Sequence, residues 1–208
     1  MDYLIESLAD EEGYRGFLRL HRHRLRHSLF GGGMGEPILR ERLEGLRAVA
    51  VLPYDPLADQ VVLVEQFRIA ALEQGPGAWL LDIPGGVWEP GQDAETAARR
   101  EVLEETGCAL SGLVPIGDFW VSPGTSSERA QLYCGRVRAP QDGTVHGLAH
   151  EGEDIRVRVL CRTGALAALA GGHITAAPAV IGLQWLALHL DELKRRWSSG
   201  GPAENDNP

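Results

Sequence analysis

Apolar and polar residues alternate along much of the chain with the two-residue period of a β-strand. Successive strand residues point to opposite faces, so an alternating run, or a short run of β-branched apolar residues, predicts a strand. The runs lie at residues 14–30, 37–44, 47–53, 60–68, 79–83, 113–121, 131–137 and 155–161. The pattern therefore predicts strands along most of the chain.

Three segments are typical of helices instead. The first follows Asp93, which is suited to capping a helix N-terminus, and stops at Gly107, which is suited to the residue after a helix. Alanines 94, 97 and 98 run along one side of this helix and would let it pack closely against a sheet. Residues 164–170 form a short alanine-rich helix, and 177–197 carry a helical apolar stripe that suits a core or an interface.

The first predicted strand is unusually basic. Within residues 14–30, Arg22, Arg24 and Arg26 share one face and the histidines at 21, 23 and 27 share the other. His21 and His23 suggest a metal site, but no acidic or cysteine residue stands near them in the sequence. We therefore favour a basic strand on a solvated or subunit-facing surface.

The glycines at 31–33 and 35 predict a turn between this strand and its partner at 37–44. A sheet of so few strands is not stable alone, so it must pack on the main domain or on another subunit. We expect an N-terminal β-sheet and dimerisation region at 1–45, a main domain at 46–197 and a disordered tail at 198–208. Within the main domain, residues 140–153 form a long connection without periodicity, which is often functional.

Composition narrows the partners. The 208 residues carry a net charge of −9 and have a pI near 5.3, which argues against nucleic acid or an anionic membrane as the main partner. No apolar run approaches the roughly 20 residues of a membrane span, and the N-terminus lacks the order of a signal peptide. Three widely spaced cysteines, 108, 134 and 161, read as buried thiols of a reducing compartment. We expect a cytoplasmic protein.

Candidate metal-binding residues lie on the predicted helix that begins after Asp93. At about 100° per residue, Glu101, Glu104 and Glu105 project from one face. Such a cluster suits a hard divalent cation, Mg²⁺ above all, because like charges so close repel one another without one. The alternative is an ordinary solvated acidic face. Gly85, Gly86 and Gly91, ahead of the helix, suggest a loop with special backbone angles.

The stretch 85–108, GGVWEPGQDAETAARREVLEETGC, resembles the Nudix box. Its pattern is G, five residues, E, seven residues, REU, one residue, EE, one residue and GU, with U apolar. The matching residues are Gly86, Arg100, Glu101, Val102, Glu104, Glu105, Gly107 and Cys108. One position departs from this pattern, because Gln92 stands where the family has the first glutamate. The resemblance implies that this glutamate is a structural partner of the motif arginine. We expect a weaker brace to Arg100 and an intact active site. The resemblance implies an α+β fold, the α/β/α sandwich of Nudix proteins.

Further features are similar to the ADP-ribose pyrophosphatase branch of that family. Pro123 stands sixteen positions after Gly107, inside the string SPGTSSER, and HGLAHEGEDIRV at 146–157 resembles the loop that supplies a catalytic glutamate. Carried over by position, Glu151 is the general base and Glu153 completes the metal site. Without the box, an ordinary acidic turn would be the better interpretation of this loop.

The resemblance also assigns the nucleotide contacts and the quaternary structure. Phe17, in the string YRGF, falls where an aromatic ring stacks on adenine, Arg40 and Arg68 fall where arginines bind the nucleotide, and Glu128 joins this substrate-binding set. The family exchanges N-terminal sheets across a homodimer, so Phe17 and Arg40 would serve a neighbouring subunit. Read without the family, Phe17 is a core aromatic and the arginines are surface charges at strand ends.

These assignments imply one reaction. Glu101, Glu105, Glu153 and the carbonyl of Gly85 gather Mg²⁺, or Mn²⁺, with Glu104 as a further ligand or support, and Glu101, Glu105 and Glu151 are catalytic. ADP-ribose would give AMP and ribose 5-phosphate. Two alternatives stay open: another nucleoside diphosphate sugar such as GDP-mannose as substrate, or a nucleotide-binding relative that has lost hydrolysis.

Overall fold

The computed structural model describes residues 3–73, 77–88 and 91–198. The tail predicted to be disordered lies outside these residues from 199 onward. The chain divides into two compact units, which are described separately. The smaller contains residues up to Arg47 together with 120–129, and the larger contains 48–119 and the residues from 130 onward.

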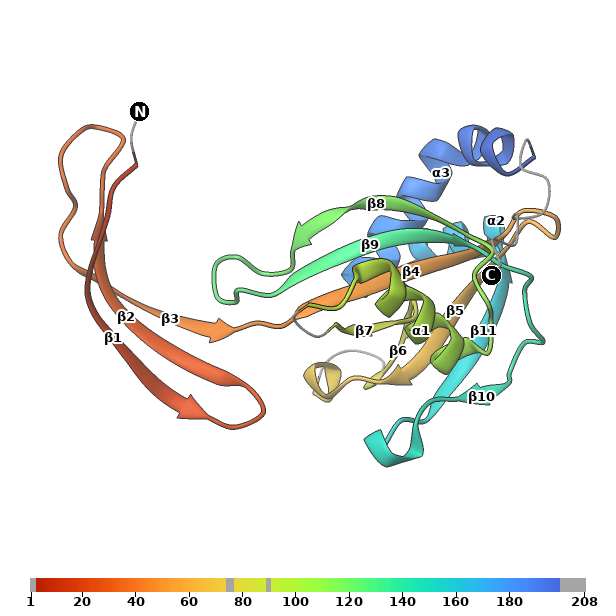
Figure 1. The fold of residues 1–208 in the computed structure, drawn as a ribbon, viewed down its shortest axis with the longest axis horizontal. Coiled ribbons are helices and arrows are strands. Elements are labelled where there is room, and N and C mark those ends of the chain that lie inside the picture. Colours follow the sequence, from red (N-terminus) through yellow and green to blue (C-terminus); the bar gives the residue numbers. More distant parts are fainter. Residues whose placement is uncertain (1–2, 74–76, 89–90, 199–208) are drawn as a thin grey trace. The chain divides into compact units, whose positions relative to one another are not determined.

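The larger unit is built on an eight-stranded sheet (Figure 1). The path through the sheet is β10-β11-β5-β4-β9-β8, with β6 paired to β5 and β7 paired to β4. The strands are β4 (Arg47–Asp55), β5 (Gln60–Phe67), β6 (Trp79–Asp82), β7 (Gly85–Val87), β8 (Gly112–Trp120), β9 (Arg129–Arg136), β10 (Val145–His146) and β11 (Ile155–Cys161). The strands predicted between residues 47 and 161 are all present.

Alternation along β4 shows how the sheet is covered on both faces. Val49 and Val51 pack into a cluster with Ala97 and Ala98 of α1 (Ala94–Thr106). The intervening residues of β4 pack into a second cluster with α2 (Arg162–Ala170) and α3 (Ala177–Ser198). One helix therefore covers one face and two helices cover the other, as Figure 1 shows. The predicted α+β sandwich is confirmed.

The ends of α1 are set by local chemistry that the sequence predicts correctly. The side chain of Asp93 accepts a hydrogen bond from the backbone N–H of Thr96, which satisfies one of the free donors of the first turn. At the other end Gly107 adopts a left-handed conformation, with φ of 70°, and its N–H donates to the carbonyl of Leu103. Both caps hold the acidic face of α1 in a fixed register on the sheet.

The smaller unit is a three-stranded antiparallel sheet in the order β1-β2-β3. Its strands are β1 (Ile5–Arg15), β2 (Arg19–His27) and β3 (Ile38–Glu44). The single strand predicted over 14–30 is wrong, because the chain reverses between β1 and β2. The prediction also missed most of β1, whose acidic residues give little apolar alternation. Ion pairs between the strands compensate for this lack of apolar contacts. One example joins Arg26 to Glu6 at 2.7 Å.

Three smaller findings complete the fold. The long connection at 140–153 contains β10 and a short 3-10 helix, η2 (Ala149–Glu151), and a second one, η1, spans Ile69–Ala71. Cys108 and Cys134 are buried as predicted, but Cys161, the last residue of β11 before α2, is exposed. Among the helices that the structure describes, none combines the length and apolarity that crossing a membrane requires.

Candidate active site

The acidic face of α1 meets the sheet, and two of its three glutamates are buried. Glu105 is only 3% exposed, and Glu101 is also buried. Arg100 holds two of the carboxylates, with 2.6 Å from its Nη2 to Oε1 of Glu101 and 2.7 Å from its Nη1 to Oε2 of Glu104. The structure thus excludes a solvated acidic face for Glu101 and Glu105.

Glycine strand β7 lies directly beneath these carboxylates. The N–H of Gly85 donates to Oε2 of Glu105 at 3.0 Å. A Cβ added at Gly86 would stand 2.5 Å from the carboxylate carbon of Glu101. Neither Gly85 nor Gly86 has a positive φ, whereas Gly91 does, at 88°. Special backbone angles are therefore confirmed only for Gly91, and the other two glycines are needed for close approach.

Burial and repulsion shift the acidity of this cluster. Burial, reinforced by Glu101 and Glu153, raises the pKa of Glu105 to about 8, although the N–H of Gly85 and the charge of Arg68 oppose the shift. Burial also raises the pKa of Glu101, against the opposing effect of Arg100. Glu153, distant in sequence, thus acts electrostatically on both helix carboxylates.

The loop that follows β10 brings Glu153 toward α1. The N–H of Gly147 donates to the carbonyl of Glu104 at 3.3 Å, which joins the loop to the helix. The carboxylate of Glu153 accepts from the N–H of Leu148 at 3.0 Å. Glu151 differs, because its side chain is 56% exposed and its nearby partner is His150 at 3.5 Å. The loop therefore fixes Glu153 and presents Glu151 at the surface.

The donor set fits a hard divalent cation. Glu101, Glu105 and Glu153 offer carboxylate oxygens, and the glycine strand β7 lies next to them. In a buried cluster, mutual repulsion and desolvation oppose the charged forms, and a cation among the oxygens would relieve both. The oxygens of these three carboxylates are hard ligands, which favour a hard divalent ion over a soft transition metal.

Comparison with known proteins decides the family. A model of the NUDIX domain matches residues 45–178. The chain belongs to the Nudix family. It is 44% identical to the ADP-ribose pyrophosphatase of Escherichia coli K12 over 194 residues, 93% of each chain. It is 41% identical to that of Haemophilus influenzae over 196 residues, 93% of this chain and 90% of the other. These relatives confirm the predicted resemblance, and the Nudix chain is an enzyme of the hydrolase class.

Two more distant proteins are also similar to the chain. The Nudix chain is 26% identical over 190 residues to the GDP-mannose pyrophosphatase of Yersinia enterocolitica, covering 91% of this chain and 98% of the other. A crystal structure described as an ADP compounds hydrolase superposes with a TM-score of 0.69 at 16% identity, covering 92% of this chain and 96% of that one. The second likeness bears on the fold alone.

The residues predicted to bind substrate fall in both units of the Nudix chain. Arg68 lies in the larger unit, close enough for its charge to act on Glu105. Phe17, Arg40 and Glu128 lie in the smaller unit. Phe17 is 89% exposed in the turn between β1 and β2, so the core interpretation of this ring is wrong within the described chain. The N–H of Glu128 donates to the hydroxyl of Ser126.

Two buried polar residues of strands β5 and β6 were missed. Asp82, at the end of β6, is buried, accepts from the N–H of Ile83 at 2.8 Å and pairs with Arg68 at 3.3 Å. Gln66 is buried, and its side-chain nitrogen has no hydrogen-bond partner among the described residues. By strand alternation Gln66 lies on the α1 face with Val62. The signal available in the sequence was a polar residue at or near the end of an apolar strand, Gln66 in β5 and Asp82 in β6.

Proposed function

We propose that this enzyme hydrolyses the pyrophosphate bond of ADP-ribose to AMP and ribose 5-phosphate with the aid of Mg²⁺. The observation that carries the proposal is the cluster of the buried Glu101 and Glu105 with the half-buried Glu153 over a glycine strand. Its support from comparison is the 44% identity, along 93% of the chain, to ADP-ribose pyrophosphatases. The acidic chain meets an anionic substrate best through such a cation site.

The residues that would hold the ion are Glu101, Glu105 and Glu153, with the carbonyl of Gly85 and with Glu104 in support. When bound, Mg²⁺, or Mn²⁺ in its place, neutralises the diphosphate oxygens and increases the acidity of a water molecule. Arg100 keeps Glu101 and Glu104 in place through its two ion pairs. Arg68, itself positioned by Asp82, offers a positive charge to the nucleotide.

Glu151 is the proposed general base. Its exposed position on η2 allows it to accept a proton from water as the water oxygen attacks one phosphorus. The bond from that phosphorus to the bridging oxygen then breaks, and the other phosphate leaves. Gly147 and Gly152, with φ of 101° and 73°, give the loop the turns that this placement needs.

The first test measures ADP-ribose hydrolysis with Mg²⁺ by Glu105→Gln and Glu151→Gln variants. We expect each to lose on the order of 10² to 10⁴ in kcat, since removal of a general base or a metal ligand acts on the transition state. Glu192→Gln is the matched control, because Glu192 is exposed on α3. A variant within a few-fold of the parent removes that residue from the mechanism.

GDP-mannose is the second candidate substrate, because a GDP-mannose pyrophosphatase is also similar along 91% of the chain. The chemistry would be the same, since the carboxylate cluster serves the diphosphate and other residues select the base and the sugar. A panel of nucleoside diphosphate sugars ranked by kcat/KM separates the two. Calorimetric binding of ADP-ribose without AMP formation would instead indicate a binding protein without hydrolysis.

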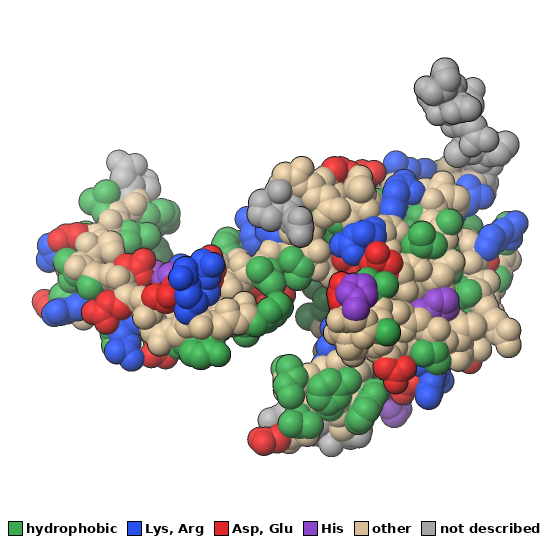
Figure 2. All heavy atoms as spheres, turned by 60° about the horizontal axis from the view of Figure 1, so that its bottom comes forward, with side chains coloured by type: hydrophobic (Ala, Val, Ile, Leu, Met, Phe, Trp, Pro, Cys, Tyr) green, Lys and Arg blue, Asp and Glu red, His purple; other side chains and the backbone are tan. Residues whose placement is uncertain are grey.

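We further propose that the enzyme is a homodimer that exchanges its N-terminal sheets. The smaller unit exposes many large apolar side chains, and Figure 2 shows apolar side chains among basic and acidic ones on this unit. They include Tyr3, Leu4, Ile5, Leu8, Tyr14, Phe17, Leu18, Leu29, Phe30 and Leu39. A second subunit would remove these surfaces from water.

A further inference from the structure

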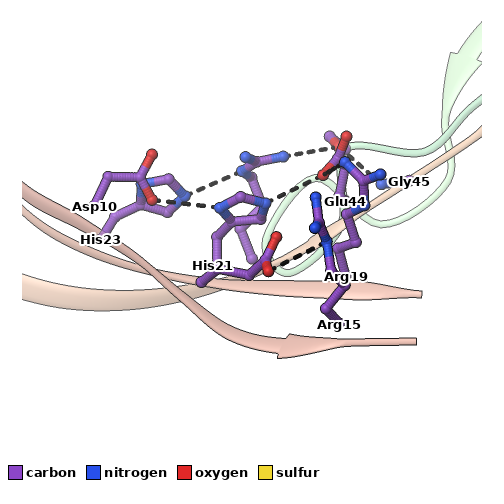
Figure 3. A network of polar contacts seen from close by, with 10 residues as sticks. Asp10, Arg15, Arg19, His21, His23, Glu44 and Gly45 are labelled. Atoms are coloured by element: carbon purple, nitrogen blue, oxygen red, sulfur yellow. Dashed lines mark hydrogen bonds and ion pairs between the residues drawn. The ribbon is translucent and has the colours of Figure 1, made fainter. Parts of the chain in front are cut away.

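Two histidines and an aspartate meet on one face of the N-terminal sheet. Asp10 of β1 stands opposite His23 of β2 in the strand register, and His21 lies two residues along β2 on the same face. Oδ1 of Asp10 is 3.4 Å from Nδ1 of His21 and 3.4 Å from Nδ1 of His23. Figure 3 shows the two imidazoles side by side, both turned toward the Asp10 carboxylate. Asp10 could not be recognised from the sequence as a partner of these histidines, because most of β1 was not predicted.

The two separations from Asp10 match those between ligand atoms of a tetrahedral metal site. Zinc binds histidine nitrogen and carboxylate oxygen at about 2.0 to 2.2 Å, so two of its ligand atoms stand about 3.4 Å apart. The three donor atoms here lie within 4.8 Å of one another, and the histidine rings are stacked at an interplanar angle of 14°. Small side-chain movements would therefore bring all three atoms onto one ion. A water molecule would complete four ligands.

A second carboxylate supports one of the histidines. Oε2 of Glu44, on β3, lies 3.1 Å from Nε2 of His21, the ring nitrogen that does not face Asp10. Metal-binding histidines commonly donate their other N–H to a carboxylate, which fixes the tautomer and the ring orientation. His21 is thus arranged to bind a metal through Nδ1 while donating from Nε2.

We propose that Asp10, His21 and His23 bind a transition metal of the Zn²⁺ class and so tie β1 to β2. The two imidazoles favour such an ion over Mg²⁺, which prefers oxygen ligands. The site lies in the smaller unit and uses none of the carboxylates of Glu101, Glu105 and Glu153. The proposal is therefore independent of the proposed hydrolysis. Both histidine side chains are 19% exposed, which leaves them reachable by an ion from solvent.

Arg42 contacts His23 at the ring nitrogen opposite the one proposed to bind the metal. Its Nε donates to Nε2 of His23 at 3.2 Å, so the proton of the neutral ring lies on Nδ1. A metal on Nδ1 requires that proton on Nε2, where it faces the Arg42 donor. Binding must therefore displace Arg42 from His23, although its second contact, to the hydroxyl of Ser127 at 3.1 Å, can persist. Arg42 is thus a competitor of the metal.

The experiment titrates the chelator-treated full chain with Zn²⁺ against a chromogenic zinc indicator, in excess Mg²⁺ to occupy oxygen sites. We expect the parent to bind one more equivalent of Zn²⁺ than His21→Gln and His23→Gln, or to bind it at least about tenfold more tightly. His27→Gln is the matched control on the same face of β2, and circular dichroism checks that each variant is folded. Equal binding by the parent and both folded variants would overturn the proposal.

Two further variants test the atoms assigned. Replacement of Arg42 by Met removes the competing donor, so Zn²⁺ affinity should rise, whereas Glu44→Gln should lower it about 10- to 100-fold. In parallel, Co²⁺ should give the intense visible absorption of a tetrahedral site in the parent and not in His23→Gln. An Arg42→Met variant with unchanged affinity would overturn binding through Nδ1 of His23, and identical Co²⁺ spectra for parent and His23→Gln would overturn the site.

Discussion

Gly86 and Glu101 illustrate at the residue scale how a missing side chain builds the site. The motif glycine is needed because the Glu101 carboxylate occupies the space of its Cβ. Gly85 is needed for another reason, since a Cβ there would collide with the backbone of Val49 and Ala50. The sequence showed that these glycines were special, but loop conformation was the wrong reason for both. Only packing between α1 and β7 distinguishes a positive φ from a close approach.

Alanine at these two positions should therefore have different effects. Gly86→Ala pushes the flexible carboxylate of Glu101, which we propose binds the metal, so kcat/KM for ADP-ribose should fall about 10- to 100-fold, with little change in Tm. Gly85→Ala strikes backbone that cannot yield locally, so Tm itself should fall. Hydrolysis and thermal unfolding of both variants check this. Equal loss of Tm in both would show that Gly86 serves packing alone.

At the element scale, Asp55 organises the turn between β4 and β5 and anchors the residues after β9. It is 4% exposed, and its Oδ1 accepts from the N–H groups of Leu57 and Ala58 while its Oδ2 accepts from that of Ala139 at 3.0 Å. Burial opposes the charged form, but the three donors outweigh it and lower the pKa of Asp55. A single carboxylate thus satisfies three backbone donors.

Asp55→Asn should cost about 1 to 3 kcal/mol of unfolding free energy at pH 7, because an amide nitrogen would face a backbone N–H. Since the folded pKa is lowered, the stabilisation is present above the unfolded pKa of about 3.9 and is lost as pH falls through the folded value. The gap between parent and variant should therefore shrink below pH of about 4. Denaturant unfolding across this range measures it, with Asp191→Asn, on α3, as control. A gap that widens in acid would contradict the assignment.

Elements with clear capping residues or a clear apolar periodicity could be predicted from the sequence. Elements held by pairs of charged residues could not. The caps of α1, the apolar strands β4 and β5 and the stripe of α3 follow from local sequence. Strand β1 does not, because its partners are arginines and histidines on β2, which single-strand periodicity cannot reveal. The same omission hid Asp10 from His21 and His23. Asp82 was likewise hidden, since its pairing with Arg68 depends on the contact of β5 with β6.

At the scale of the whole molecule, the smaller unit exposes an apolar surface. Tyr3 and Phe30 are 71% and 85% exposed, and their rings meet edge to face at 6.3 Å. With Leu4, Leu29 and Met34 they line an apolar hollow of about 320 Å³. Exposed aromatic residues beside a hollow are typical of an interface centre. In the proposed homodimer the second subunit covers this hollow.

The double variant Tyr3→Ser, Phe30→Ser should therefore shift the protein from dimer to monomer. Light scattering after size exclusion should give twice 22.6 kDa for the parent and 22.6 kDa for the double variant. The physical reason is that buried aromatic anchors supply a large share of the binding free energy in an interface. Leu188→Ser is the control, because this leucine is 82% exposed on α3 in the larger unit. A monomeric parent would contradict the dimer, and an unchanged mass in the double variant would exclude the hollow from its interface.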